Sequence, residues 1–286
     1  MPRSLPADVL GIIANYSEKP TLAVLVRVSS TVRAISLRPL YTSIEVVGSG
    51  SMTQCLVTLA ENTDIAALVQ ELRISCGSMI PRELSEIAAR ALEQVVNLTT
   101  LWLTLPYNWA TSKILVRARF RLRDFTCDLK SDPEYPIAQF LESQPGLISL
   151  FLSRHCQSLL GLEASALPAL STLFGPLSIL RDILPGRIDR MKRIGCQNKS
   201  GSSGPVNDIR EFTEVLRGAQ IKPDSNAPIS VLIGVELGSS DATSAIETAL
   251  SGLGDQAPWI GSLGIIIFGH ANQVSSSGVF VTRLCF

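Results

Sequence analysis

The stretch "LTTLWL", residues 98–103, places apolar side chains at its first, fourth and sixth positions. Alternate residues of a β-strand point to opposite faces of its sheet. The fourth and sixth residues, Leu101 and Leu103, should therefore share one face, and the fifth, Trp102, should lie on the other. The pattern predicts a short strand that is buried on one face only.

The same spacing recurs along the chain. Further copies begin at Val69, Leu122, Leu147 and Leu170, so successive starts, including Leu98, are 29, 24, 25 and 23 residues apart. Leucine-rich repeats have a period of about 20 to 29 residues. Helical patterns lie between the copies, and a repeated strand and helix is the unit of such a solenoid.

The pattern weakens after residue 176, but the alternation of strand and helix continues. Ile188-x-x-Met191 suggests one more copy, and residues 197–207 have the composition of a loop. The expected helices are 81–96, 135–144, 208–219 and 239–254, and the expected later strands are 228–237 and 259–268. We therefore expect an α/β fold: an irregular leucine-rich-repeat solenoid of parallel strands, with helices on its convex side. An ordinary α/β domain with a parallel sheet is the alternative.

The first forty residues contain three short helical patterns. Pro6 suits the first position of a helix, Ser29 suits an N-cap, and Pro39 should end the third helix. A unit of this size rarely buries enough surface to be stable alone. We expect its apolar face to pack on something else.

The residues of this segment resemble an F-box over positions 3–42. The resemblance rests on Leu5-Pro6-x-Asp8-Val9-Leu10-x-x-Ile13, on Leu22-x-x-Leu25-x-x-Val28-Ser29, and on Arg33 and Leu40-Tyr41. Val32 departs from the family, which usually has Phe or Trp there. With the degenerate repeats that follow, the chain is similar to the F-box-like proteins of mushroom-forming fungi. The expected domains are an F-box at 1–42 and a repeat solenoid at 43–286.

The resemblance implies a substrate-recognition subunit of a cullin-type ubiquitin ligase, acting in protein degradation in the cytoplasm or nucleus. Its F-box would bind a Skp-type adaptor and, through it, a cullin, while the repeats would bind an unknown protein target. The implied adaptor-binding residues are Leu5, Pro6, Val9, Leu10, Ile13, Val28 and Arg33. The alternatives are a plain helical cap and a leucine-rich-repeat scaffold with no ligase role.

The fifth residues of the repeats should form one column on the exposed face of the sheet. Aromatic side chains on such a face are typical of binding hot spots. The candidates for target binding are Arg73, Trp102, Thr126, Phe151 and Phe174, with a weaker continuation at Lys192. A register slip of one residue would instead turn the aromatic members into the core.

Composition excludes several classes of partner. The 25 basic and 25 acidic residues give a net charge of zero, which argues against nucleic acid as a partner. No stretch has the roughly 20 consecutive apolar residues of a membrane-spanning helix. The six cysteines are scattered and no secretory signal precedes them, so they read as buried thiols in a reducing compartment.

No catalytic motif, cofactor-binding motif or metal-ligand spacing is found, so we expect no enzyme, cofactor or metal. His155 and Cys156 are adjacent, and on a strand they would point to opposite faces and not meet. An α/β enzyme is the least favoured alternative.

Residues 113–125 alternate four arginines with apolar residues, which predicts either a docking strip for an acidic segment or a solvated edge. The arginines are Arg117, Arg119, Arg121 and Arg123.

Overall fold

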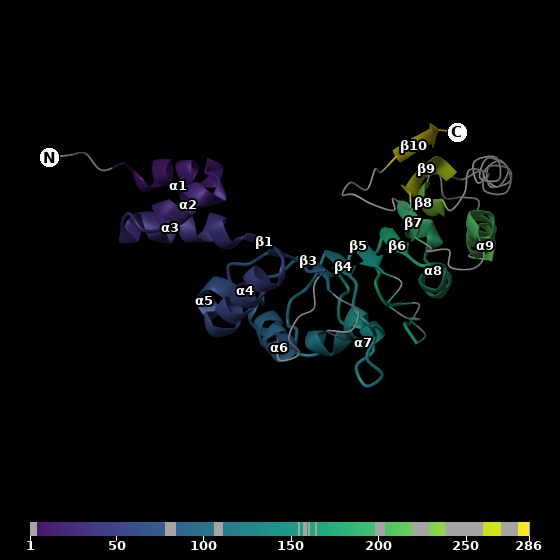
Figure 1. Ribbon diagram of the computed structural model, residues 1–286, viewed down its shortest axis with the longest axis horizontal. Helices are drawn as coiled ribbons and strands as arrows, with labels where there is room; N and C mark the ends of the chain where they lie inside the picture. Colours follow the sequence, from purple (N-terminus) through teal and green to yellow (C-terminus); the bar gives the residue numbers. More distant parts are fainter. Residues whose placement is uncertain are drawn as a thin grey trace. The chain divides into compact units, whose positions relative to one another are not determined.

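A computed structural model shows a mixed α/β protein with parallel strands and helices (Figure 1). It divides into two compact units, Met1–Trp109 with Ile114–Leu122, and Ala110–Lys113 with Arg123–Phe286. No helix in the part that the structure describes is long and apolar enough to span a bilayer. The described residues are 5–77, 84–105, 111–153, 155–156, 159, 161–163, 165–197, 204–218, 229–237, 260–269 and 280–285.

The first unit opens with three helices, α1 (Ala7–Tyr16), α2 (Lys19–Leu25) and α3 (Ser30–Tyr41). Both α1 and α2 pack against α3. The predicted cap of α3 is confirmed, because the Ser29 hydroxyl accepts a hydrogen bond from the Val32 N–H at 3.2 Å.

The expectation that Pro39 ends the third helix is wrong, since α3 continues to Tyr41. A proline removes one helical hydrogen bond, but the helical bonding resumes after Pro39. The backbone N–H and the hydroxyl of Thr42 both donate to the Arg38 carbonyl, at 2.9 and 2.7 Å.

Three parallel strands follow in chain order within the first unit. They are β1 (Ser43–Val47), β2 (Glu71–Ser75) and β3 (Thr100–Thr104). The connecting helices are α4 (Ser49–Glu61), α5 (Thr63–Ala66) and α6 (Leu84–Gln94). Gly48 makes the turn from β1 into α4 at a φ of 90°, a conformation that glycine adopts without steric cost.

The second unit contains six strands that pair in parallel, each with the next in the chain. They are β4 (Asp124–Cys127), β5 (Ser149–Leu152), β6 (Thr172–Gly175), β7 (Arg193–Gln197), β8 (Ile229–Leu237) and β9 (Ile260–Gly269). An antiparallel strand, β10 (Phe280–Cys285), pairs with β9. The helical segments are η1 (Ser112–Leu115), α7 (Ile137–Glu142), α8 (Leu177–Ile183), η2 (Ile188–Arg190) and α9 (Gly204–Gly218). The predicted helix 239–254 lies outside the described residues.

The strands have one buried face, with the alternation that the sequence predicts. In each repeat the fourth and sixth residues are buried beneath the helices, and the fifth is exposed or half-buried on the opposite face. The buried pairs of the aligned strands are Leu72 and Ile74, Leu101 and Leu103, Phe125 and Cys127, and Leu150 and Leu152. The helices therefore cover one face of each unit's sheet.

The expected copy at Ile188 is wrong. Residues Ile188–Arg190 form the 3₁₀ turn η2, and the strand that follows places Gly195, not Lys192, beside Phe174. The repeat is instead Met191-x-x-Ile194-x-Cys196, in which all three apolar side chains are buried. Ile188 is also buried. The patterns that begin at Ile188 and at Met191 therefore both contain core residues, and only the strand pairing shows which of them is the repeat.

Candidate functional site

Helix α1 exposes a line of large apolar side chains. Val9, Ile12, Ile13 and Tyr16 follow the spacing i, i+3, i+4 and i+7, which places them on one side of a helix. Their exposed fractions are 38%, 59%, 44% and 88%. Leu5, before the helix, is 56% exposed. This side of α1 covers no core of the unit.

The three N-terminal helices enclose almost no core of their own. Among their described apolar residues only Ala14 and Leu22 are buried, with 1% and 2% exposed. The other end of the segment adds two more exposed apolar side chains, Val24 and Val28, at 64% each. The three helices thus leave most of their apolar residues exposed or half-buried.

The structure places the seven implied adaptor-binding residues on or near the surface. Leu10 is half-buried, and the others are exposed: Leu5, Pro6, Val9, Ile13, Val28 and Arg33. Sequence reasoning missed Ile12, Tyr16 and Val24. The spacing of seven from Val9 to Tyr16 is the signal that predicts Tyr16 on the same side of α1.

In the first unit the fifth residues of three strands lie side by side. Glu45 is paired with Arg73, and Arg73 with Trp102. The Arg73 guanidinium lies 5.7 Å from the centre of the Trp102 ring, a cation–π distance. The Trp102 indole N–H donates to Thr104 Oγ1 at 2.9 Å, and the ring stays 44% exposed. Trp102 is thus held in place yet accessible. Glu45 was missed, although Tyr41-x-x-Ile44-x-Val46 has the repeat's spacing.

In the second unit the corresponding column is Thr126, Phe151, Phe174 and Gly195. The rings of Phe151 and Phe174 are stacked, with centroids 5.3 Å apart and an interplanar angle of 18°. A Cβ on Gly195 would lie 1.9 Å from Cδ1 of Phe174, so the phenyl ring occupies the space above this glycine. Both rings are half-buried, and together they form an aromatic ledge on the open face of the sheet.

A row of polar side chains lies beside this ledge. The strand register places Ser149, Thr172, Arg193 and Ser230 next to one another, one strand after another. These positions are two residues before the ledge positions, so they lie on the same face. The open face of the second unit therefore carries an apolar row and a parallel polar row of three hydroxyl side chains and one arginine.

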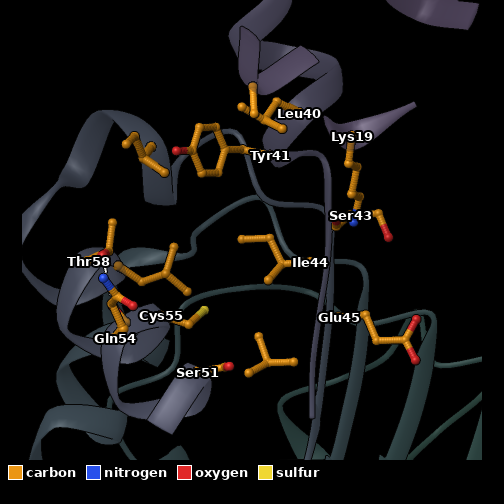
Figure 2. Close-up of a pocket in the computed structure, with 14 residues that line it drawn as sticks. Lys19, Leu40, Tyr41, Ser43, Ile44, Glu45, Ser51, Gln54, Cys55 and Thr58 are labelled. Carbon is orange, nitrogen blue, oxygen red and sulfur yellow. Dashed lines mark hydrogen bonds between the residues drawn. The ribbon is translucent and has the colours of Figure 1, made fainter. Parts of the chain in front are cut away.

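A cavity of about 480 Å³ lies in the first unit between strand β1 and helices α2 to α5 (Figure 2). Apolar side chains of Leu40, Ile44 and Val46 contribute to its lining, and Lys19 and Cys55 lie at its margin. The Lys19 ammonium donates to the Ser43 carbonyl. Burial raises the pKa of the Cys55 thiol to about 11, so this group is neutral at physiological pH. Nothing in the sequence pattern predicted the cavity.

The arginine segment is not one extended strand. Its first residues belong to η1, whereas Phe120 and Leu122 are buried and their arginine neighbours exposed, as alternation predicts. Arg117 and Arg119 both contact Glu93 of α6, at 4.0 and 3.7 Å. Exposed ion pairs of this kind contribute little stability. The arrangement favours the solvated edge over a docking strip.

His155 and Cys156 do not form a catalytic pair. They lie in the turn after β5, where His155 Nδ1 contacts Asp128 Oδ1 at 2.7 Å and the Ser153 hydroxyl donates to the same oxygen. A serine nucleophile would give its proton to the imidazole, not to the carboxylate. The Cys156 thiol instead donates to backbone carbonyls.

Four cysteine side chains that the structure describes are buried: Cys76, Cys127, Cys156 and Cys196. Burial raises the pKa of Cys127 well above its usual value, so its thiol stays protonated. Within the described ranges, no three His, Cys, Asp or Glu side chains are grouped so that they could hold a metal ion.

No protein-family model matches the chain, and a search of curated proteins finds no match.

Proposed function

We propose that this chain is the substrate-recognition subunit of a Skp–cullin–F-box ubiquitin ligase. Residues 1–42 act as the F-box that binds a Skp-type adaptor, and residues 43–286 form a degenerate leucine-rich-repeat solenoid that binds a protein target. The chain catalyses no reaction in this proposal. It works in the cytoplasm or nucleus by bringing the target to the ligase.

The observation that carries the proposal is the exposed apolar surface of the N-terminal helices. Seven of the eleven large apolar side chains that the described structure leaves exposed lie in residues 5–28. Burying one such side chain contributes about 1.5–3 kcal/mol, so a partner that covers several gains substantial binding energy. The seven are Leu5, Val9, Ile12, Ile13, Tyr16, Val24 and Val28.

The identity of the partner comes from the motif. The Leu5-Pro6 start and the spacing through Val28 and Arg33 resemble an F-box, whose partner is a Skp-type adaptor. A helical cap would bury its apolar face against the following domain. Here Val9, Ile13 and Val28 remain exposed in a chain that includes that domain. This supports an external partner over the cap.

The test is binding of the purified chain to a purified Skp-type adaptor, for the wild type and a Leu5→Ala/Pro6→Ala double variant. Truncating a buried apolar anchor costs about 2 kcal/mol, so the affinity should fall about thirtyfold. Val47→Ala is the matched control, because Val47 is 71% exposed but lies in β1. Its affinity for the adaptor should equal that of the wild type.

Two outcomes would contradict the adaptor proposal. Equal binding by the double variant would remove the F-box assignment. If the wild type does not bind the adaptor at all, the scaffold without a ligase role replaces it.

Target binding is proposed for the open face of each unit's sheet. Its support is the exposure of Trp102, its contact with Arg73, and the stacked ledge of Phe151 and Phe174. Large aromatic side chains dominate binding hot spots, and solenoids bind on the exposed face of their strands. Thr126 is paired with Phe151 in the second unit and is the remaining candidate.

Alanine at Trp102 and Phe151 should abolish capture of the target while adaptor binding and thermal stability change little. The control is Val116→Ala, since Val116 is 52% exposed but lies outside the strands. Unchanged target capture by the Trp102→Ala/Phe151→Ala variant would exclude this face.

A further inference from the structure

Strand β1 is an edge of the first unit's sheet, and it has a free side. Among the strands that the structure describes it pairs with β2 alone, through alternate residues. The Thr42 carbonyl accepts from the Gln70 and Glu71 N–H groups of that side, and the Gly48 N–H donates to the Ser75 carbonyl. The even-numbered residues of β1 therefore face β2, whereas Ser43, Glu45 and Val47 direct their N–H and C=O groups away from it.

One of these outward groups is already occupied. The Lys19 ammonium donates to the Ser43 carbonyl, which confirms that Ser43 faces outward. Glu45 and Val47 lie two and four residues after Ser43, so their backbone groups point to the same side. The described residues provide no hydrogen-bond partner for these groups. Both side chains are exposed, Val47 by 71%. A row of open backbone donors and acceptors is a template for another strand.

The cavity lies beside this edge, on the face of β1 that points toward α4. Figure 2 shows Ile44 pointing into the cavity, where Cys55 also lies, and Glu45 on the opposite side of the strand. A strand added beside β1 would alternate in the same way. One of its side chains would enter the cavity, and the next would lie near Glu45 on the open face.

Charge decides which residue fits beside Glu45. On the β2 side Glu45 is paired with Arg73, an opposite charge. A basic residue on the added strand would repeat this arrangement, whereas a like charge directly opposite is destabilising. Antiparallel self-pairing of β1 centred on Glu45 would set two glutamates against each other. The edge thus disfavours a second copy of this chain.

We propose that the edge of β1 binds an extended peptide segment of another protein, in which apolar residues flank a lysine or arginine. The backbone of Glu45 and Val47 holds the peptide as an added strand. Its apolar side chains pack toward Ile44 and Cys55, and its basic side chain pairs with Glu45. Helices α2 and α3 line part of the cavity, but the backbone groups of Glu45 and Val47 and the exposed side of α1 belong to different elements.

The probe is the synthetic peptide acetyl-SLKVS-amide, titrated into the full chain while the amide NMR signals of Glu45 and Val47 are followed. We expect both signals to shift. Two N-methylated peptides, with methyl groups on alternate residues, provide matched controls because only one set of N–H groups faces β1. One of them should bind about tenfold more weakly, and the other should bind like the parent.

Charge reversal is the second arm. The wild-type chain should prefer acetyl-SLKVS-amide over acetyl-SLEVS-amide, and Glu45→Lys should reverse that preference. Ser51→Phe, at the rim of the cavity, should weaken both peptides while thermal unfolding stays near that of the wild type. Three results would overturn the proposal: no shift at Glu45 and Val47 with millimolar peptide, equal binding of the two N-methylated peptides, or dimerisation through β1 in light scattering.

Discussion

Gly195 shows how one residue determines the aromatic ledge. If Gly195 carried a Cβ, the three atoms nearest to it would all be ring atoms of Phe174, at 1.9, 2.2 and 2.9 Å. Gly195→Ala must therefore displace that ring from its stack with Phe151. Overpacking of this kind costs about 1–3 kcal/mol, which urea unfolding would measure.

The control for Gly195 is a double-mutant cycle. In a Phe174→Ala background the ring is gone, so Gly195→Ala should cost much less there. Additive effects of the two substitutions would show that the ring does not occupy the space above Gly195.

Cys55 gives a prediction on pH. Burial raises the pKa of its thiol from 9.0 to about 11. At pH 8 the thiolate fraction is about a hundredfold lower than in an ordinary thiol, so alkylation by iodoacetamide should be slow and keep rising above pH 10. Mass spectrometry of the Cys55 peptide measures this rate. A rate that levels off near pH 9, as in the urea-unfolded chain, would contradict the prediction.

The same shift has a consequence for stability. Below about pH 9 the Cys55 thiol is protonated in both the folded and unfolded states, so its contribution is fully present there. Between pH 9 and about 11 only the unfolded state loses the proton. This contribution to the free energy of unfolding is therefore lost as the pH rises through that window.

At the scale of elements, Arg187 ties the end of α8 to the loop before β6. It is only 2% exposed, and its guanidinium donates to the carbonyls of Ile183, Ala166 and Glu163. Burial lowers the pKa of this group. The three carbonyls satisfy the buried charge by hydrogen bonds alone.

Arg187→Met should remove the guanidinium donor from all three carbonyls, of which Glu163 keeps a bond from the Ala166 N–H, and cost about 3 kcal/mol of unfolding free energy. Arg190 is the matched control, because it is exposed and donates to the Pro168 carbonyl at 3.1 Å. Arg190→Met should cost under about 1 kcal/mol. Equal destabilisation by the two substitutions would show that the buried hydrogen bonds of Arg187 contribute no more stability than the exposed one of Arg190.

Most strands were predictable because their apolar residues have a period of two and a fixed spacing. The prediction failed at Ile188 because both overlapping patterns are buried, and only pairing with β6 distinguishes them. It also failed at Pro39, where Thr42 closes the helix by contacts that no local pattern reveals. Periodicity reports which side chains are buried, but not how a strand pairs or how a helix end is satisfied.

At the scale of the whole molecule, the candidate surfaces were predictable to different degrees. The exposed position of Trp102 follows from the alternation of a single strand. The exposed apolar side of α1 follows in part from helical spacing. The cavity beside β1 brings Lys19, Leu40 and Cys55 together from separate elements, so only tertiary packing creates it.

The high apolar content of the chain, 46%, is distributed unevenly on its surface. The strands and helices beyond β1 bury most of their apolar residues, whereas α1 and its neighbours do not. The N-terminal segment buries two of its described apolar side chains, Ala14 and Leu22. A partner that covers its exposed apolar side chains therefore stabilises it. We therefore expect adaptor binding to stabilise this segment more than any other part of the chain.

Hydrogen–deuterium exchange of the full chain, with and without a saturating Skp-type adaptor, tests this claim most directly. We expect the adaptor to slow exchange in peptides that cover residues 5–33 and to change it little in peptides from β2 onward. Unchanged exchange in residues 5–33 at saturating adaptor would contradict it.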